Sequence, residues 1–457
     1  MWPGARPKRR AKRLAHSATS IRPRQRLNLA SVFPSAQDDG MSATRGIGRR
    51  DFLKSGAAAI AGVMILPRSV FGANAKVDVA FIGAGGKGSS AIKGLAGNEA
   101  VNIVAFADVD EKRAGATYKE LPDVPRFTDF RKMLEKVGKG IDAVVISTPD
   151  HTHHYCGKWC MRLGKHVYVE KPLAHNIAQC RDLIDAERRY RVVCQMGNQG
   201  HSGAGIAMLG AWAKAGVFGE IREFRAWCNS DWSFADAARP AAEPVPAGFD
   251  WSMWLGPAQE VPHSTRYYPS RWRGWFDFGN GALGDWACHN MDAPWTVFEL
   301  GYPSKVQIES TGPLKLSFPK SAKVTYTFPA KPGRKEMVLT WYQGPDFPPE
   351  RPAGLEEGRE MGSKGGGCLI IGSKATAMMS SHAGTPRIIP EAKAQEMAPA
   401  LPKVTERRSG HLENWIQAIR GEEKARSHFA YAGLLTEVMQ MGKIALHLNC
   451  DRNSTRL

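Results

Sequence analysis

Residues 77–88 read Val-Asp-Val-Ala-Phe-Ile-Gly-Ala-Gly-Gly-Lys-Gly, and this stretch decides the fold. Its first half is a short apolar run of the kind that forms a strand buried on both faces. The run enters a Gly-x-Gly-x-x-Gly turn at Gly83, and a helical stretch follows to about Gly97. A strand that passes through such a turn into a helix is typical of dinucleotide-binding domains.

The glycines of this turn have separate physical roles. Gly83 permits the tight turn, Gly85 lets the backbone approach a pyrophosphate, and Gly88 lets the helix pack closely on the strand. Free N–H groups and the positive end of the helix dipole would then hold the pyrophosphate. We therefore expect the turn to bind the cofactor through Gly83, Gly85, Gly86 and Gly88.

A second apolar run ends in an acidic residue, Asp108, twenty residues after Gly88. A carboxylate at this point can accept hydrogen bonds from both hydroxyls of an adenosine ribose. It would repel a 2′-phosphate, so we expect the cofactor to be NAD rather than NADP. Arg113 follows closely enough in the sequence to weaken that preference.

The alternation of apolar strands and helices continues beyond Asp108. We expect strands over 141–148, 164–172 and 191–196 and a helix over 176–190. This alternation indicates a doubly wound parallel sheet, which binds ligands at the carboxyl ends of its strands. Thr148, Pro149 and Lys171 lie at such ends, so we place them in the cofactor site.

Several motifs, taken in order, resemble the Gfo/Idh/MocA oxidoreductase family. In the first domain they are the glycine turn, Ser147-Thr148-Pro149 and Glu170-Lys171-Pro172. Further on they are residues 284–289 with an Asp-x-x-x-His pair, the turn 372–375 with Ala in place of its last Gly, and the helix 411–421. The resemblance covers roughly 77–448.

The resemblance implies a fold and the place of the active site. The fold would be α/β, with a Rossmann domain followed by an α/β domain that holds a large open, mostly antiparallel sheet. The active site would lie between that sheet and the nicotinamide, with Glu170 among the cofactor-binding residues. Stretches with strand character fit this second sheet; they are 221–228, 304–310, 322–328, 336–341 and 368–371.

The proposed catalytic residues are Lys171, Asp285 and His289. Oxidation of a secondary alcohol needs a proton acceptor whose pKa lies near the working pH, which favours His289 as general base. Asp285 lies one helical turn earlier, where it could orient the imidazole or bind a second hydroxyl. Lys171 would bond the reacting oxygen. The alternative is an aspartate that caps a helix, followed by a surface histidine.

The second domain is rich in aromatic residues. Eight of the thirteen Trp lie between Trp227 and Trp295, and Tyr267 and Tyr268 accompany them. Aromatic faces stack on the C–H faces of sugars, yet we expect most of these Trp to form core and subunit contacts. Two further groups have two interpretations each, on even terms. Substrate contacts or interface contacts are expected for Arg266, Arg271 and Arg273. A place in the cleft or in a hydrogen-bonded crossover loop is expected for Asn198, Gln199 and His201.

The net charge of +18 would ordinarily suggest a polyanionic partner. Eleven of these charges lie in residues 1–75, and the remaining seven are unremarkable. Residues 1–40 are Arg- and Pro-rich, so we expect a disordered extension or a misplaced start. Residues 41–75 resemble a twin-arginine signal, with Arg49-Arg50, an apolar run too short to span a bilayer, and Ala73-Asn74-Ala75.

These patterns divide the chain into five parts. After 1–40 and 41–75 we expect the Rossmann domain over 76–196, the substrate domain over 197–448, and an irregular, truncated tail over 449–457. We expect export of the folded protein to the periplasm or beyond through the twin-arginine machinery. We expect a homo-oligomer, without nucleic acid as a partner and without a stable membrane anchor.

The eight cysteines show no spacing of a disulfide framework. Cys156 and Cys160, with His151, His153 and His154 nearby, could form a metal site. We favour buried thiols on a helix that begins after Pro149, and we expect no metal.

Export restricts the chemistry, because no free pool of NAD is expected outside the cytoplasm. The cofactor must then be tightly bound and regenerated within a closed cycle. The substrate would be a sugar, cyclitol or glycoside that exchanges a hydride with the cofactor. The alternative is a glycosidase that uses NAD for transient oxidation, elimination, water addition and re-reduction.

Overall fold

The computed structural model describes residues 76–230, 232–233, 238–311, 316–405 and 407–448. The expectations for the extension, the export signal and the tail fall on 1–75 and 449–457, outside the described residues. The first sheet has six parallel strands in the order β3-β2-β1-β4-β5-β6. They are β1 (Val77–Ile82), β2 (Val101–Ala107), β3 (Arg126–Phe127), β4 (Ala143–Ile146), β5 (His166–Val169) and β6 (Cys194–Met196).

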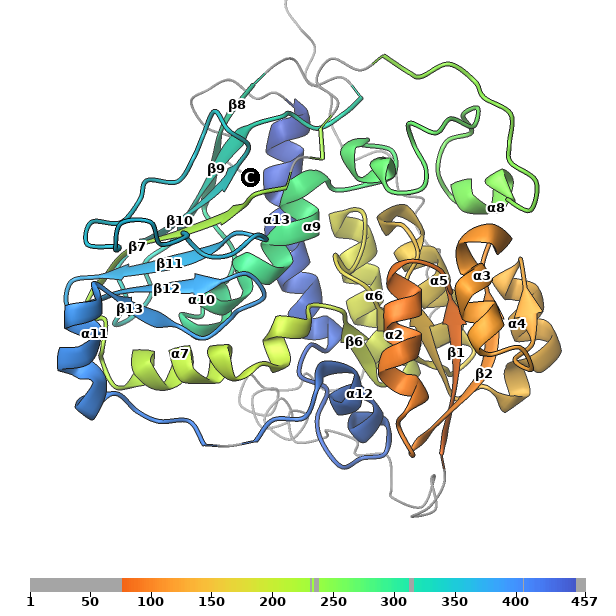
Figure 1. The fold of residues 1–457 in the computed structure, drawn as a ribbon, viewed down its shortest axis with the longest axis horizontal. Helices are drawn as coiled ribbons and strands as arrows, with labels where there is room; N and C mark the ends of the chain where they lie inside the picture. Colours follow the sequence, from red (N-terminus) through yellow and green to blue (C-terminus); the bar gives the residue numbers. More distant parts are fainter. Residues whose placement is uncertain (1–75, 231, 234–237, 312–315, 406, 449–457) are drawn as a thin grey trace, which may run out of the picture. The chain divides into compact units, whose positions relative to one another are not determined.

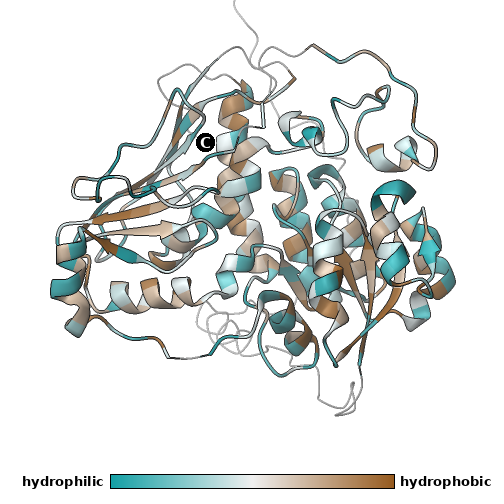
Figure 2. Ribbon diagram, viewed as in Figure 1, coloured by the Kyte–Doolittle hydropathy of each residue, from teal (hydrophilic) through white to brown (hydrophobic). Residues whose placement is uncertain are grey.

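This strand order is that of a doubly wound Rossmann sheet, as the sequence predicts. All four residues of β4 and of β5 are buried, because helices cover both faces of the sheet. The helices of this domain are α2 (Lys87–Ala96), α3 (Glu111–Glu120), α4 (Phe130–Val137), η2 (Gly138–Gly140), α5 (Asp150–Arg162) and α6 (Ile177–Tyr190). Figure 2 shows β1 and β2 as hydrophobic and α3 as largely hydrophilic.

The second sheet has seven strands in the order β13-β12-β11-β7-β10-β9-β8. Only β7 and β10 pair in parallel, and the other neighbours are antiparallel, so the sheet is mostly antiparallel as expected. The strands are β7 (Ile221–Cys228), β8 (Lys305–Ser310), β9 (Ala322–Phe328), β10 (Met337–Gln343), β11 (Gly367–Gly372), β12 (Thr376–Ser380) and β13 (Arg387–Ile389). Five of them match predicted stretches, whereas β12 and β13 were not anticipated.

The remaining helices follow β6, the last strand of the first sheet. They are η3 (Gln199–Ser202), α7 (Ala204–Lys214), α8 (Trp251–Leu255), η4 (Arg271–Gly274), α9 (Gly281–Asn290), α10 (Asp292–Val297), α11 (Glu391–Met397), η5 (Ala398–Ala400), α12 (His411–Ile419) and α13 (Phe429–Leu448). Among the described helices, none is long and apolar enough to cross a membrane.

Two late helices join the sheets. Helix α13 contacts α6 and β6 of the first domain and also α9 and β8 of the second (Figure 1). Helix α12 places Trp415, Ile416 and Ile419 in the same hydrophobic cluster as β1. The chain therefore returns to the Rossmann domain after building the second sheet, and α9 packs between α13 and the strands β7 and β10.

Candidate active site

The glycine turn lies at the carboxyl end of β1 and has the geometry of a nucleotide cradle. Gly83 and Gly86 have φ angles of +89° and +54°, which side chains other than glycine rarely adopt. A Cβ on Gly88 would lie 1.8 Å from the carbonyl oxygen of Gly83, so only glycine lets α2 begin here. The turn therefore fits a pyrophosphate and supports NAD as the group that this domain holds.

Asp108 lies directly beside this turn. Its carboxylate accepts hydrogen bonds from the N–H groups of Ala84 and Gly85 at 2.7 and 2.9 Å, and from that of Asp110 at 2.9 Å. Burial raises the pKa of Asp108, although these three bonds oppose the change. Arg113 lies over the turn, because a Cβ on Gly86 would lie 2.6 Å from its guanidinium.

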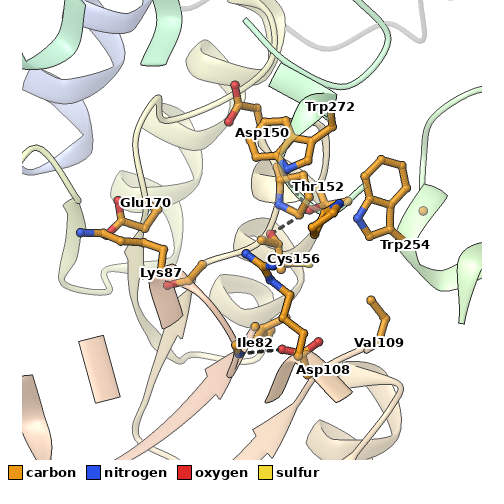
Figure 3. A pocket seen from close by; sticks show the side chains of 18 of the residues that line it. Ile82, Lys87, Asp108, Val109, Asp150, Thr152, Cys156, Glu170, Trp254 and Trp272 are labelled. Atoms are coloured by element: carbon orange, nitrogen blue, oxygen red, sulfur yellow. Dashed lines mark hydrogen bonds and ion pairs between the residues drawn. The ribbon is translucent and has the colours of Figure 1, made fainter. Parts of the chain in front are cut away.

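A cavity of about 300 Å³ opens from this turn towards the second domain (Figure 3). Most of the predicted cofactor residues line it: Gly83, Gly85, Asp108, Thr148, Pro149, Glu170 and Lys171. Lys87 Nζ lies 3.7 Å from Glu170 Oε1, and the Gln199 amide donates to the same oxygen at 3.1 Å. Gly86 and Gly88 belong to the turn itself.

Lys171 lines the cavity and forms an ion pair with Asp285, which is not among the lining residues. Lys171 Nζ lies 2.5 Å from Asp285 Oδ1 and 2.7 Å from the backbone oxygen of Asp285. Arg273 and Trp232 also donate to this carboxylate, at 3.2 and 2.8 Å. Burial disfavours the charged forms of Lys171 and Asp285, but the attraction between the two charges outweighs this effect. The pKa of Lys171 is raised and that of Asp285 is lowered.

His289 lies one turn after Asp285 on α9 and also lines the cavity. Asn280 precedes the helix and His289 is 3% exposed, so the pair is not a capping aspartate with a surface histidine. Its Nδ1 is buried without a hydrogen-bond partner among the described residues. Burial, Lys171 and His382 hold its pKa well below the ordinary value of 6.5.

The sequence did not indicate His382 or Asp150, and both line the cavity. The His382 ring stacks on that of His289, with 3.9 Å between centroids and 27° between planes. Asp150 is buried at the start of α5 and accepts from Asn280 Nδ2 at 2.7 Å. No recognisable motif surrounds His382, whereas Pro149-Asp150 at a strand end offered a signal for Asp150.

The residues with two interpretations from the sequence are divided: some line the cavity and others belong to the core or to a separate buried cluster. Arg273, Gln199 and the indoles of Trp254, Trp272 and Trp286 line the cavity. Most of the other indoles lie in the core, as expected; they are Trp227, Trp251, Trp275 and Trp295. Asn198 and His201 instead bond Asp292 in a buried cluster with Tyr431.

The cysteines that the structure describes are all buried thiols. Cys156 and Cys160 pack into the main hydrophobic cluster from α5, which begins directly after Pro149 as expected. No group of three His, Cys, Asp or Glu in the described part of the chain could hold a metal ion.

Two family models match the chain. One, described as an oxidoreductase family with an NAD-binding Rossmann fold, matches residues 77–198, and the other, described as the C-terminal α/β domain of that family, matches residues 218–328. The chain belongs to the Gfo/Idh/MocA oxidoreductase family. Its first domain is therefore an NAD-binding Rossmann domain, and the two matches together cover just over half of the sequence.

The relatives of this chain include proteins described as glycosyl hydrolases and a protein described as a dehydrogenase. A stretch of 153 residues is 37% identical to the glycosyl hydrolase family 109 protein 3 of Phocaeicola vulgatus, covering 32% of this chain and 28% of that protein. A stretch of 113 residues is 35% identical to the inositol 2-dehydrogenase 1 of Saccharopolyspora erythraea, covering 24% and 33%. The chain thus spans less than half the length of the curated relatives it matches.

The fold recurs in solved structures. The WlbA dehydrogenase of Bordetella pertussis, solved with NADH and UDP-GlcNAcA, superposes with a TM-score of 0.58 at 15% identity. The superposition covers 84% of this chain and 98% of that one. This likeness supports the arrangement of two domains described above.

Proposed function

We propose that this protein transfers a hydride between a secondary alcohol of a sugar, cyclitol or glycoside and a tightly bound NAD. The observation that carries the proposal is that Lys171 and His289 line one cavity with the glycine turn and Asp108, and that Asp285 pairs with Lys171. An acid–base group, a cation and a nucleotide cradle are the components that alcohol oxidation requires.

The roles follow from the contacts of each residue. When bound, NAD supplies the acceptor for the hydride. The lowered pKa of His289 keeps its imidazole neutral, so it can take the proton of the substrate hydroxyl. Two donors of the Lys171 ammonium bond Asp285. The third can meet the substrate oxygen and stabilise its developing charge.

A glycosidase that uses NAD within a closed cycle is the second candidate. It is favoured by the resemblance to proteins described as glycosyl hydrolase family 109, at 29% to 37% identity over their matched stretches. Its chemistry needs the same hydride transfer, so Lys171, Asp285 and His289 serve both candidates.

Tight cofactor binding is supported by residues 248–278, here called the aromatic strap. The Asp250 N–H donates to the Val109 carbonyl at 2.8 Å, and the Glu111 N–H donates to the Gly248 carbonyl at 3.0 Å. Tyr268 donates its hydroxyl to Asp110 at 2.6 Å. The strap therefore contributes lining residues to the cavity while these bonds fasten it to the residues that follow β2, and we expect it to slow the release of a bound nucleotide.

The two candidates are separated by incubation with a panel of nitrophenyl glycosides and no added NAD. Release of the aglycone without net NADH indicates the glycosidase, whereas reduction of the bound nucleotide alone indicates the dehydrogenase. Lys171→Ala and His289→Ala should each lower either rate by roughly 100-fold or more. Unchanged turnover in both variants would overturn the assignment of the site.

A further inference from the structure

His382 occupies a position that neither the family resemblance nor the proposed hydride transfer explains. It follows β12 at the mouth of the cavity, and its imidazole covers that of His289. The indole of Trp286 stands at the edge of both rings, with centroid distances of 5.8 and 6.3 Å. Two imidazoles thus face the space in which a substrate would react.

The backbone that carries His382 is strained, and the rest of the fold holds it in place. His382 and Ala383 have φ angles of +61° and +50°, a left-handed conformation that such residues rarely adopt. A Cβ on Gly200 would lie 2.1 Å from the His382 carbonyl oxygen. Strain of this kind persists only where surrounding structure enforces it, and it gathers at functional sites.

The ring of His382 is also oriented and kept in the neutral form. Ser381 Oγ lies 2.7 Å from its Nδ1, which fixes the ring and leaves Nε2 as the second nitrogen. Burial and the ammonium groups of Lys171 and Lys87 lower the pKa of His382, and the Asp285 carboxylate opposes them. His289 stacks on the same ring, so a neutral His382 can receive a proton.

Alcohol oxidation needs one proton acceptor, which His289 already provides. A second acceptor is needed when the carbon beside the new ketone must lose its proton. We propose that His382 is a second catalytic acid–base residue that takes this proton, so that the cavity performs elimination as well as oxidation. This inference rests on the proposed function and assigns this chain to its glycosidase form.

The complete cycle balances. With NAD⁺ bound as the hydride acceptor, the carbinol carbon would give up its hydride and His289 would take the hydroxyl proton. His382 takes the proton from the adjacent carbon while the bond to the aglycone breaks, which gives an unsaturated ketone and an aglycone anion. Water adds its hydroxide at the carbon that lost the aglycone, its proton neutralises the aglycone, and His382 returns its proton. The hydride and the proton on His289 then return, so the net reaction is hydrolysis.

The test uses the purified protein with its own nucleotide, a panel of nitrophenyl glycosides and deuterated water. His382→Asn is the main variant, because Asn tolerates positive φ but transfers no proton. We expect it still to reduce the bound nucleotide, with a smaller loss of rate than for the steps that follow. Aglycone release and deuterium uptake at the adjacent carbon should both fall by roughly 100-fold or more. His154→Gln is the matched control, since His154 on α5 bonds Asp182 on α6 and neither residue lines the cavity.

Chemical rescue separates proton transfer from a structural role. His382→Gly suits the positive φ and leaves space beside His289, so added imidazole should restore aglycone release. Wild-type deuterium uptake in His382→Asn, equal loss of nucleotide reduction and aglycone release, or absence of rescue would each overturn the assignment. A wild-type enzyme that reduces its nucleotide but takes up no deuterium would overturn this inference alone. One that does neither would overturn the proposed function as well.

Discussion

At the scale of single residues, the charge of Lys171 depends on one carboxylate. Burial lowers the pKa of Lys171, and Asp285 reverses that effect. In Asp285→Asn the pKa of Lys171 should therefore fall below its ordinary value of 10.5. The alkaline limb of nucleotide reduction should move to lower pH, and the rate at neutral pH should fall by roughly 100-fold. Rapid-mixing pH profiles check this, and an alkaline limb that stays in place would assign it to another group.

The pH dependence of the wild-type enzyme tests His289. Its lowered pKa means that the imidazole loses its proton-accepting form only as the pH falls well below 6.5. Nucleotide reduction should thus be independent of pH between 6.5 and the alkaline limb set by Lys171, and should decline only well below pH 6.5. His289→Gln should abolish this limb. A limb centred at or above pH 6.5 would be inconsistent with the buried, neutral base described here.

The residues of the site differ in how far sequence could reveal them. Asp285, His289 and Lys171 were selected because Asp-x-x-x-His and Glu-Lys-Pro resemble family motifs and follow a nucleotide-binding turn. The spacing of four residues alone would equally fit a capping aspartate and a surface histidine. His382 follows an unanticipated strand, and its backbone packs closely against Gly200, which is distant in the sequence. Such a placement depends on tertiary packing and leaves no local pattern.

At the scale of elements, the aromatic strap should control how long the nucleotide stays bound. Tyr268→Phe removes the hydrogen bond to Asp110, a bond to a charged acceptor worth about 1.5–3 kcal/mol. The nucleotide should then dissociate at least tenfold faster, as measured by its loss during dialysis or by competition with labelled NAD. Tyr302→Phe is the matched control, since its hydroxyl bonds Glu437 at 3.0 Å on another part of the surface. Equal retention in both variants would show that the strap does not hold the nucleotide.

Strands were predicted well where burial alone specifies them. The strands β4 and β5 are apolar runs because both faces of a parallel sheet are covered. The strands β12 and β13 are short and lie at one side of the second sheet, joined by the loop that carries His382. Their pairing depends on β11 and on the turn 372–375, so neither has a periodic signal of its own.

At the scale of the whole molecule, most of the net positive charge lies in the N-terminal extension and the proposed twin-arginine signal. Eleven of the eighteen net charges lie before residue 76, outside the described domains. Replacing Arg49 and Arg50 together with Lys should leave the protein in the cytoplasm with its cofactor bound, whereas the native chain should reach the periplasm. Cell fractionation checks this. Export of the variant at the native level would contradict the twin-arginine proposal without affecting the proposed chemistry.

The central claim is that one cavity holds NAD and uses it on an alcohol substrate without releasing it. The most direct measurement is the nicotinamide absorbance of the purified protein, with no nucleotide added, after mixing with a panel of sugars, cyclitols and nitrophenyl glycosides. At least one substrate should reduce the bound nucleotide, and Lys171→Ala and His289→Ala should show no change. Protein that carries no nucleotide, or equal reduction in both variants and the native enzyme, would contradict the claim.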